Sequence, residues 1–102
     1  MVVTILYRTG RGTRPEAARI RDYSDRIARH FRQVSAIDWT VAGEPPAARV
    51  SCRVRAGRAE YRARAEAMNY QSALDQVLER VVRQRRRAKR MRTRGRRGGD
   101  RR

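Results

Sequence analysis

The sequence of 102 residues lacks most of the features that mark enzymes, membrane proteins and disulfide-stabilised proteins. Its single cysteine, Cys52, can form neither an internal disulfide nor a thiolate metal site, which fits a reducing cytoplasm. Its single histidine, His30, has no nucleophile and acid around it in a recognisable pattern, so we expect no catalytic residue, metal, cofactor or small-molecule substrate. No run approaches the roughly 20 apolar residues of a membrane span. No basic segment precedes the short apolar N-terminal run, so a signal peptide is not expected either.

Acidic residues are also scarce, since 10 stand against 27 basic residues and the formal net charge is +17. Residues 1–79 hold 14 basic and 9 acidic residues, whereas residues 80–102 hold 13 basic residues and a single acid, Asp100. The positive charge is therefore concentrated at the C-terminal end, which indicates a polyanionic partner. All basic residues except Lys89 are arginine. Arginine suits phosphate binding, although GC-rich codon usage produces the same bias.

The N-terminal part of the chain predicts a strand followed by a helix. Val2–Arg8 is a β-branched and aromatic run that ends at a glycine-containing turn. Thr13-Arg14-Pro15-Glu16 has the form of a capping box with proline in the first turn, which predicts a helix from about Arg14 to Gln33. The apolar stripe of this helix recurs at steps of three and four and consists of Ile20, Tyr23, Ile27, Phe31 and Val34.

The next segments alternate between apolar and polar residues, which is typical of strands with one buried face. A strand through Ile37, Trp39 and Val41 ends at Gly43-Glu44-Pro45-Pro46, and a hairpin follows around Ala56-Gly57. Cys52, Trp39 and Tyr61 are expected in the core. The charged face of the hairpin holds Arg53, Arg55, Arg62 and Arg64, which we expect to pair across the strands with Glu60 and Glu66.

A second helix is predicted after Asn69, which is a suitable N-cap residue. Its buried stripe consists of Ala73, Leu74, Val77, Leu78, Val81 and Val82. Beyond Val82 helix-forming residues continue almost without apolar ones, so the helix is expected to leave the core as a basic extension. The glycines after residue 94 predict its end and a disordered basic tail. The expected fold is α+β, with the order β-α-β-β-β-α and two helices on one face of a four-stranded sheet. Residues 1–92 form one domain in this prediction, and residues 93–102 form the tail.

The second helix also resembles a known family, the ribosome hibernation-promoting factors and the ribosome-associated inhibitor called protein Y. Ala73-Leu74-Asp75 matches an Ala-Ile-Asp of that family, Arg80 matches a lysine, and Arg83-Gln84 matches an Arg-Gln. Arg87 and Lys89 fall on later basic positions. The strand lengths fit as well, so the resemblance spans about residues 2–92.

The chain departs from this family at three positions. Asn69 replaces an aspartate, Tyr70 stands one position earlier than the usual tyrosine, and Arg85 replaces a leucine. None of these changes removes positive charge. The resemblance implies a cytoplasmic factor that binds the small ribosomal subunit and its rRNA in the mRNA and tRNA channel, and that keeps stored ribosomes inactive under stress or in stationary phase. It also implies a short form, whose basic tail favours the hibernation-promoting branch, and a separate ribosome-modulation factor as a further partner.

The residues expected to contact RNA lie mainly on the basic extension of the second helix, because no acid occurs from Arg80 to Gly99 and such a run repels itself without a partner. Arginines of the first helix fit a solvated face equally well, and Tyr70 is the one aromatic candidate. The full predicted set is Arg80, Arg83, Gln84, Arg86, Arg87, Lys89, Arg90, Arg26, Arg29 and Tyr70.

Three functions are compatible with this basic helix. The first is the hibernation factor, which acts by occupancy and promotes ribosome dimers in some settings. The second is a general RNA-binding chaperone or ribosome-associated basic protein without a defined decoding-site role. The third is a binder of anionic membranes or acidic proteins, which is disfavoured because Ala88 and Met91 are the only apolar residues of the extension.

Overall fold

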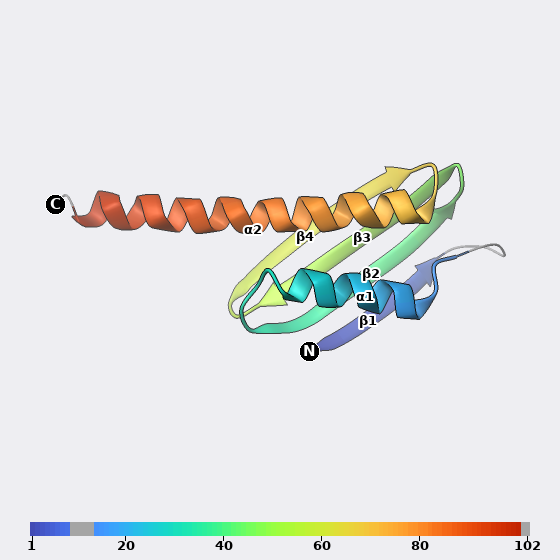
Figure 1. The fold of residues 1–102 in the computed structure, drawn as a ribbon, viewed down its shortest axis with the longest axis horizontal. Helices are drawn as coiled ribbons and strands as arrows, with labels where there is room; N and C mark the ends of the chain where they lie inside the picture. The colour runs from blue at the N-terminus through green and yellow to red at the C-terminus, as the bar shows by residue number, and fades with distance from the viewer. Residues whose placement is uncertain (9–13, 101–102) are drawn as a thin grey trace.

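The computed structural model describes residues 1–8 and 14–100, with the side chains of residues 89–100 outside the described part. The elements are β1 (Val2–Arg8), α1 (Ala17–Ala28), β2 (Val34–Glu44), β3 (Ala47–Ala56), β4 (Ala59–Ala67) and α2 (Tyr70–Asp100). Both helices cover the same face of one four-stranded sheet (Figure 1). The predicted α+β fold and its β-α-β-β-β-α order are therefore confirmed.

The sheet has the order β1-β2-β3-β4, so strands that follow each other in sequence are neighbours in space. β1 and β2 are parallel, because α1 carries the chain back between them, whereas the other two pairs are antiparallel. In the β2–β3 register Trp39 lies opposite Cys52 and Thr40 lies opposite Ser51. Since side chains alternate along a strand, the first pair faces the helices and the second pair faces away. We call the side without helices the open face.

The helix α1 is shorter than the sequence predicts, since it begins at Ala17 and ends at Ala28. Pro15 disfavours helical backbone in the residue before it, and Glu16 itself has an extended conformation without a capping side-chain hydrogen bond. The predicted capping box is therefore wrong, and Thr13 lies outside the described residues. At the other end Gln33 has a φ of 56°, and this left-handed residue turns the chain into β2.

The core lies between the covered face of the sheet and the two helices. Ile20 and Ile27 of α1 and Trp39 of β2 are almost completely buried, and Cys52 and Tyr61 are buried too, as predicted. The Trp39 indole N–H donates to Ser24 Oγ at 2.8 Å, and this hydroxyl donates to the Ile20 carbonyl at 2.9 Å. The indole of Trp39 and the hydroxyl of Ser24 are thus both hydrogen-bonded inside the core.

The helix α2 begins as the sequence predicts and ends later than predicted. Asn69 accepts a hydrogen bond from the Ser72 N–H at 2.8 Å, which confirms it as the N-cap. The buried side chains reach Val81, and Ala88 still packs partly against the core. The helix continues to Asp100 and extends past the sheet (Figure 1), so the end predicted at the glycines after residue 94 is wrong. Arginine is a good helix former and each glycine costs only about 1 kcal/mol, so the backbone can remain helical there. The division into a domain and a tail at residue 92 stays a prediction.

Candidate nucleic-acid interface

The basic extension of α2 starts directly after the last fully buried residue of that helix, Val81. Three predicted RNA contacts, Arg83, Arg86 and Arg87, are exposed on the following two turns. Arg83 Nη2 donates to Glu79 Oε1 at 2.5 Å, an ion pair between residues four positions apart. Exposed pairs of this kind contribute only a few tenths of a kcal/mol, so a phosphate can replace the carboxylate. We call Arg83, Arg86 and Arg87 the α2 arginines.

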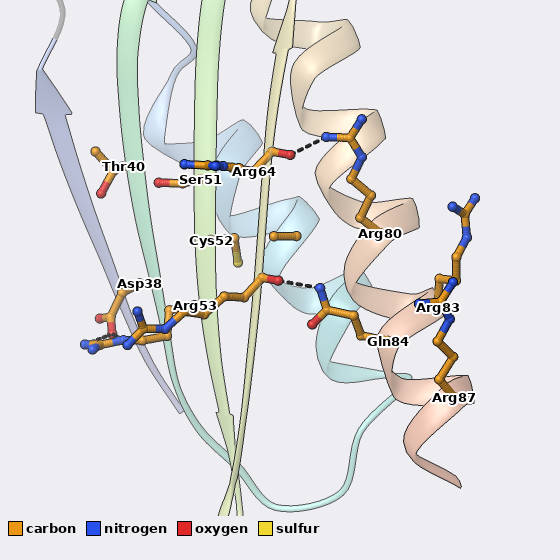
Figure 2. Close-up of a pocket in the computed structure, with 12 residues that line it drawn as sticks. Asp38, Thr40, Ser51, Cys52, Arg53, Arg64, Arg80, Arg83, Gln84 and Arg87 are labelled. Carbon is orange, nitrogen blue, oxygen red and sulfur yellow. Dashed lines mark hydrogen bonds and ion pairs between the residues drawn. The ribbon is translucent and has the colours of Figure 1, made fainter. Parts of the chain in front are cut away.

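Two other predicted contacts, Arg80 and Gln84, are engaged with the edge of the sheet. The Arg80 guanidinium donates to the Arg64 carbonyl and the Gln84 amide donates to the Arg62 carbonyl (Figure 2). Both carbonyls belong to β4, whose outer edge has no neighbouring strand among the described residues. An uncovered strand edge invites pairing with another chain. These side chains therefore have a structural role at the β4 edge. The sequence analysis missed this role because a sequence does not show which backbone carbonyls will lack a hydrogen-bond partner.

Four further predicted contacts lie in two different places. Arg26 and Arg29 are exposed at the end of α1, and the Arg26 guanidinium lies over the Tyr23 ring at 5.1 Å from its centroid. Lys89 and Arg90 belong to the α2 backbone, but their side chains lie outside the described part. The structure thus brings the α2 arginines together on one helix and leaves Arg26 and Arg29 on the neighbouring one.

Tyr70 does not fit its predicted role as an RNA contact. Its side chain is buried, and its hydroxyl donates to the Gly43 carbonyl at 2.5 Å. Burial raises the pKa of this phenol. Gly43 has a positive φ of 69°, so the end of β2 has a conformation that favours glycine. Tyr70 thus holds the start of α2 against the end of β2, and its ring is not free to stack on a base.

A surface hollow of about 770 Å³ runs from Arg83 and Arg87 around the β4 edge to the open face. Within it, Arg53 forms an ion pair with Asp38 at 2.8 Å and approaches Glu60 at 3.6 Å. Arg62 pairs with Glu60 at 3.2 Å. The hydrogen bond that Arg53 donates to the Asp38 carboxylate is the main reason why the pKa of Arg53 is raised. The expected cross-strand pairing is therefore correct for Arg53, whereas Arg62 pairs with an acid of its own strand, β4.

The same expectation is wrong for Arg55 and Arg64, neither of which forms an ion pair with any described carboxylate. Arg64 instead extends across the open face toward Ser51 (Figure 2). It lines a second hollow, of about 660 Å³, together with Arg8, Arg49, Thr40 and others. The signal that could have found this group is the strand register, which places Thr40, Ser51 and Arg64 in one row.

Arg85 is half-buried rather than part of the exposed extension. It lines a third hollow together with Phe31, Arg32 and Tyr61, and its buried Nη1 has no hydrogen-bond partner among the described residues. The arginine that replaces a leucine of the resembled family thus keeps the stem of its side chain near the core. The α2 helix accordingly loses contact with the core gradually, over a full helical turn, and not abruptly at Val82.

The described residues include few side chains that could take part in catalysis or metal binding. His30 is exposed at the end of α1, and Cys52 is buried, which raises the pKa of its thiol. No three His, Cys, Asp or Glu side chains gather into a metal site within the described ranges. Over the same part of the chain, no helix has the length and apolar character of a membrane span.

Together these features define a small, strongly basic α+β domain with one long helix on which Arg83, Arg86 and Arg87 are exposed beyond the core. Two solved structures share this fold. A ribosomal subunit interface protein from Coxiella burnetii is 17% identical, with a TM-score of 0.64 over 87% of this chain and 98% of that one. The Protein Y N-terminal domain from Thermus thermophilus is 23% identical, with a TM-score of 0.60 over 82% of this chain and 97% of that one.

The fold expected from the resemblance to protein Y is thereby confirmed. No protein-family model matches the sequence, and no curated protein sequence matches it either.

Proposed function

We propose that this chain is a ribosome hibernation factor that binds the small ribosomal subunit through rRNA and blocks translation by occupancy. The observation that carries the proposal is the placement of the α2 arginines on a rigid helix that leaves the core, within a fold shared by two proteins whose names refer to ribosomes or to protein Y. Rigid arginines lose little conformational entropy when they bind phosphates.

The mechanism in this proposal requires no chemistry from the protein. Many phosphate contacts hold a folded domain in the channel that mRNA and tRNA use, and the domain excludes both wherever their sites overlap. Such an inhibitor acts in the cytoplasm, in stoichiometric amounts and reversibly. Promotion of ribosome dimers, a response to stress or stationary phase, and a separate ribosome-modulation factor belong to the proposal as features of the resembled family.

The test is co-sedimentation of the purified chain with small ribosomal subunits across a potassium chloride series. Because each phosphate contact releases about 0.7–0.9 counterions, we expect the logarithm of the binding constant to fall linearly and steeply with the logarithm of salt concentration. Excess mRNA and initiator tRNA should displace the chain. A binding constant that does not change with salt, or inhibition well below one chain per ribosome, would contradict the proposal.

A general RNA chaperone is the second candidate, because the α2 arginines have no feature that selects one RNA sequence. It predicts equal affinity for free RNA and for assembled subunits. Competition between small subunits and an equal mass of protein-free rRNA separates the two candidates, since a hibernation factor prefers the subunit.

A further inference from the structure

The register of the sheet gathers a set of polar side chains on the open face, away from both helices. Thr40 lies opposite Ser51, and Ser51 lies opposite Arg64 on the next strand. Arg49 stands two residues before Ser51, on the same face, and Arg8 stands at the end of β1 in the neighbouring row. Together they line the hollow of about 660 Å³. We call these five residues the open-face hollow.

The charges in the open-face hollow are not compensated within the described part of the chain. None of its three arginines forms an ion pair there, and the one carboxylate that lines it, Glu66, lies opposite Arg49 in the register without forming one. The other half of the open face differs, because Arg53 and Arg62 are paired with acids. The open face is therefore divided into a half where two arginines are paired with acids and a half whose arginines form no ion pair with a described residue.

The two hydroxyls of the hollow are also available. The side chains of Thr40 and Ser51 are half-buried, and neither makes a side-chain hydrogen bond with another described residue. Arg64 extends toward Ser51 (Figure 2). Hydroxyls beside guanidinium groups are donors that suit the oxygens of a phosphate.

The chemistry of this face selects a phosphate rather than a base. The described residues that face outward from the four strands include no aromatic side chain, because Tyr7, Trp39 and Tyr61 all lie on the covered side. Base stacking, the usual means of binding single-stranded RNA on a sheet, is therefore absent from the open face.

We propose that the open-face hollow binds a phosphate group of an RNA strand. The inference rests on the proposed function, because it takes RNA as the polyanion that the chain meets. It adds a second contact on the side of the sheet opposite the helices. The domain then lies between two RNA segments, one held by the α2 arginines and one held by Arg49 and Arg64.

The test follows backbone amide NMR signals of the full chain during titration with a uridine hexanucleotide, and in a parallel arm with inorganic phosphate at equal ionic strength. We expect saturable shifts of the Thr40 and Ser51 amides with the hexanucleotide. Arg49→Gln with Arg64→Gln should weaken binding at these amides by about tenfold, since charge-assisted hydrogen bonds are lost.

A matched variant, Arg55→Gln with Arg58→Gln, removes the same charge from the other end of the hairpin and should leave binding within about twofold, because only the general field of the protein changes. All four positions are exposed, and the same spectra report whether each variant is folded. The inference is overturned if the hexanucleotide shifts other amide signals but not those of Thr40 and Ser51. It is also overturned if both variants lose the same amount of hexanucleotide binding. A third contradicting result is that these amides shift with inorganic phosphate and not with the hexanucleotide.

Small-subunit binding separates this inference from the proposed function. If the hexanucleotide occupies the open-face hollow but the chain fails to sediment with small subunits, the proposed function fails and the RNA site stands. If the chain binds subunits while the Thr40 and Ser51 amides do not respond, the inference fails and the proposed function stands. Where both hold, Arg49→Gln with Arg64→Gln should lower the salt slope of subunit binding by about 0.7–0.9, the value for one phosphate.

Discussion

The phenol of Tyr23 on α1 donates a hydrogen bond to the carboxylate of Asp75 on α2. The Gln71 amide donates to the same phenol oxygen at 2.8 Å and accepts from Arg19 at 2.7 Å, so four side chains link the two helices. Burial, followed by the hydrogen bond to Asp75, raises the pKa of Tyr23. The aspartate that matches the resembled family thus has a structural role, because it holds the helices in register above the sheet.

Tyr23→Phe is therefore expected to destabilise the fold by about 1–2 kcal/mol, the usual worth of a partly exposed hydrogen bond to a charged group. Asp75→Asn should have a similar effect. Urea denaturation of both single variants and of the double variant measures the coupling between them. Additive effects of the two changes would show that the pair does not act as a unit, and unchanged binding to small subunits is the control.

The buried thiol of Cys52 predicts a dependence of stability on pH. Its pKa is raised from the usual 9.0 by burial, so the folded protein keeps the proton while the unfolded chain loses it. The free energy of unfolding should therefore fall as the pH rises above about 9, by about 1 kcal/mol at pH 10. Denaturation of wild type and Cys52→Ala between pH 8 and pH 10 tests this, because the alanine variant lacks this contribution. A stability difference between the two proteins that stays constant with pH would refute the assignment.

The contact between Gln84 and the β4 edge predicts a structural role without a binding role. Gln84→Ala frees the Arg62 carbonyl and should lower the free energy of unfolding by about 1 kcal/mol. It removes no charge, so binding to small subunits should change by less than about twofold. Gln76→Ala on the same helix is the matched control, because Gln76 is half-buried and makes no side-chain hydrogen bond with a described residue. A large loss of binding by Gln84→Ala alone would place this amide in the RNA contact.

The α2 arginines are expected to contribute more to binding than the C-terminal residues. Arg83→Ala with Arg87→Ala should weaken small-subunit binding by about tenfold or more, because both side chains leave a helix that the core already holds in place. Truncation after Met91 removes more charge but should weaken binding only modestly. Arg55→Ala with Arg58→Ala controls for the loss of two charges in the affinity measurement. The reverse ranking would make the C-terminal residues the main anchor.

The order of the elements could be predicted from the sequence because periodicity reports which face of each element is buried. Ile20 and Ile27 follow a helical spacing, and Trp39 and Val54 follow the alternation of strands, and all four are buried. The residue type also predicts the N-cap at Asn69, because its side chain can accept a hydrogen bond from the nearby helix backbone. The ends of the elements are harder to predict from the sequence. A residue such as Gln33 adopts its left-handed conformation only when the whole sheet fixes where β2 begins.

The sequence predicts which kinds of residue form the candidate site, but it predicts only part of how those residues are arranged. The excess of arginine after residue 80 locates a basic helix, and Arg83, Arg86 and Arg87 are exposed there. The roles of Arg80 and of Tyr70 depend on carbonyl groups 16 and 27 residues away, which no local pattern encodes. The open-face hollow likewise depends on register, because a shift of one residue between two strands would separate Ser51 from Arg64.

The extension of α2 past the sheet also separates the centre of charge from the centre of mass. The molecule is 60 Å long and only 25 Å and 17 Å across, and 13 of its 27 basic residues belong to positions 80–102 at one end of the chain. Such a distribution gives the protein a large electric dipole moment along the α2 axis. A polyanion exerts a torque on that dipole before any contact forms, so the protein should approach RNA with the C-terminal half of α2 leading. Orientation during the encounter would then raise the association rate at low ionic strength.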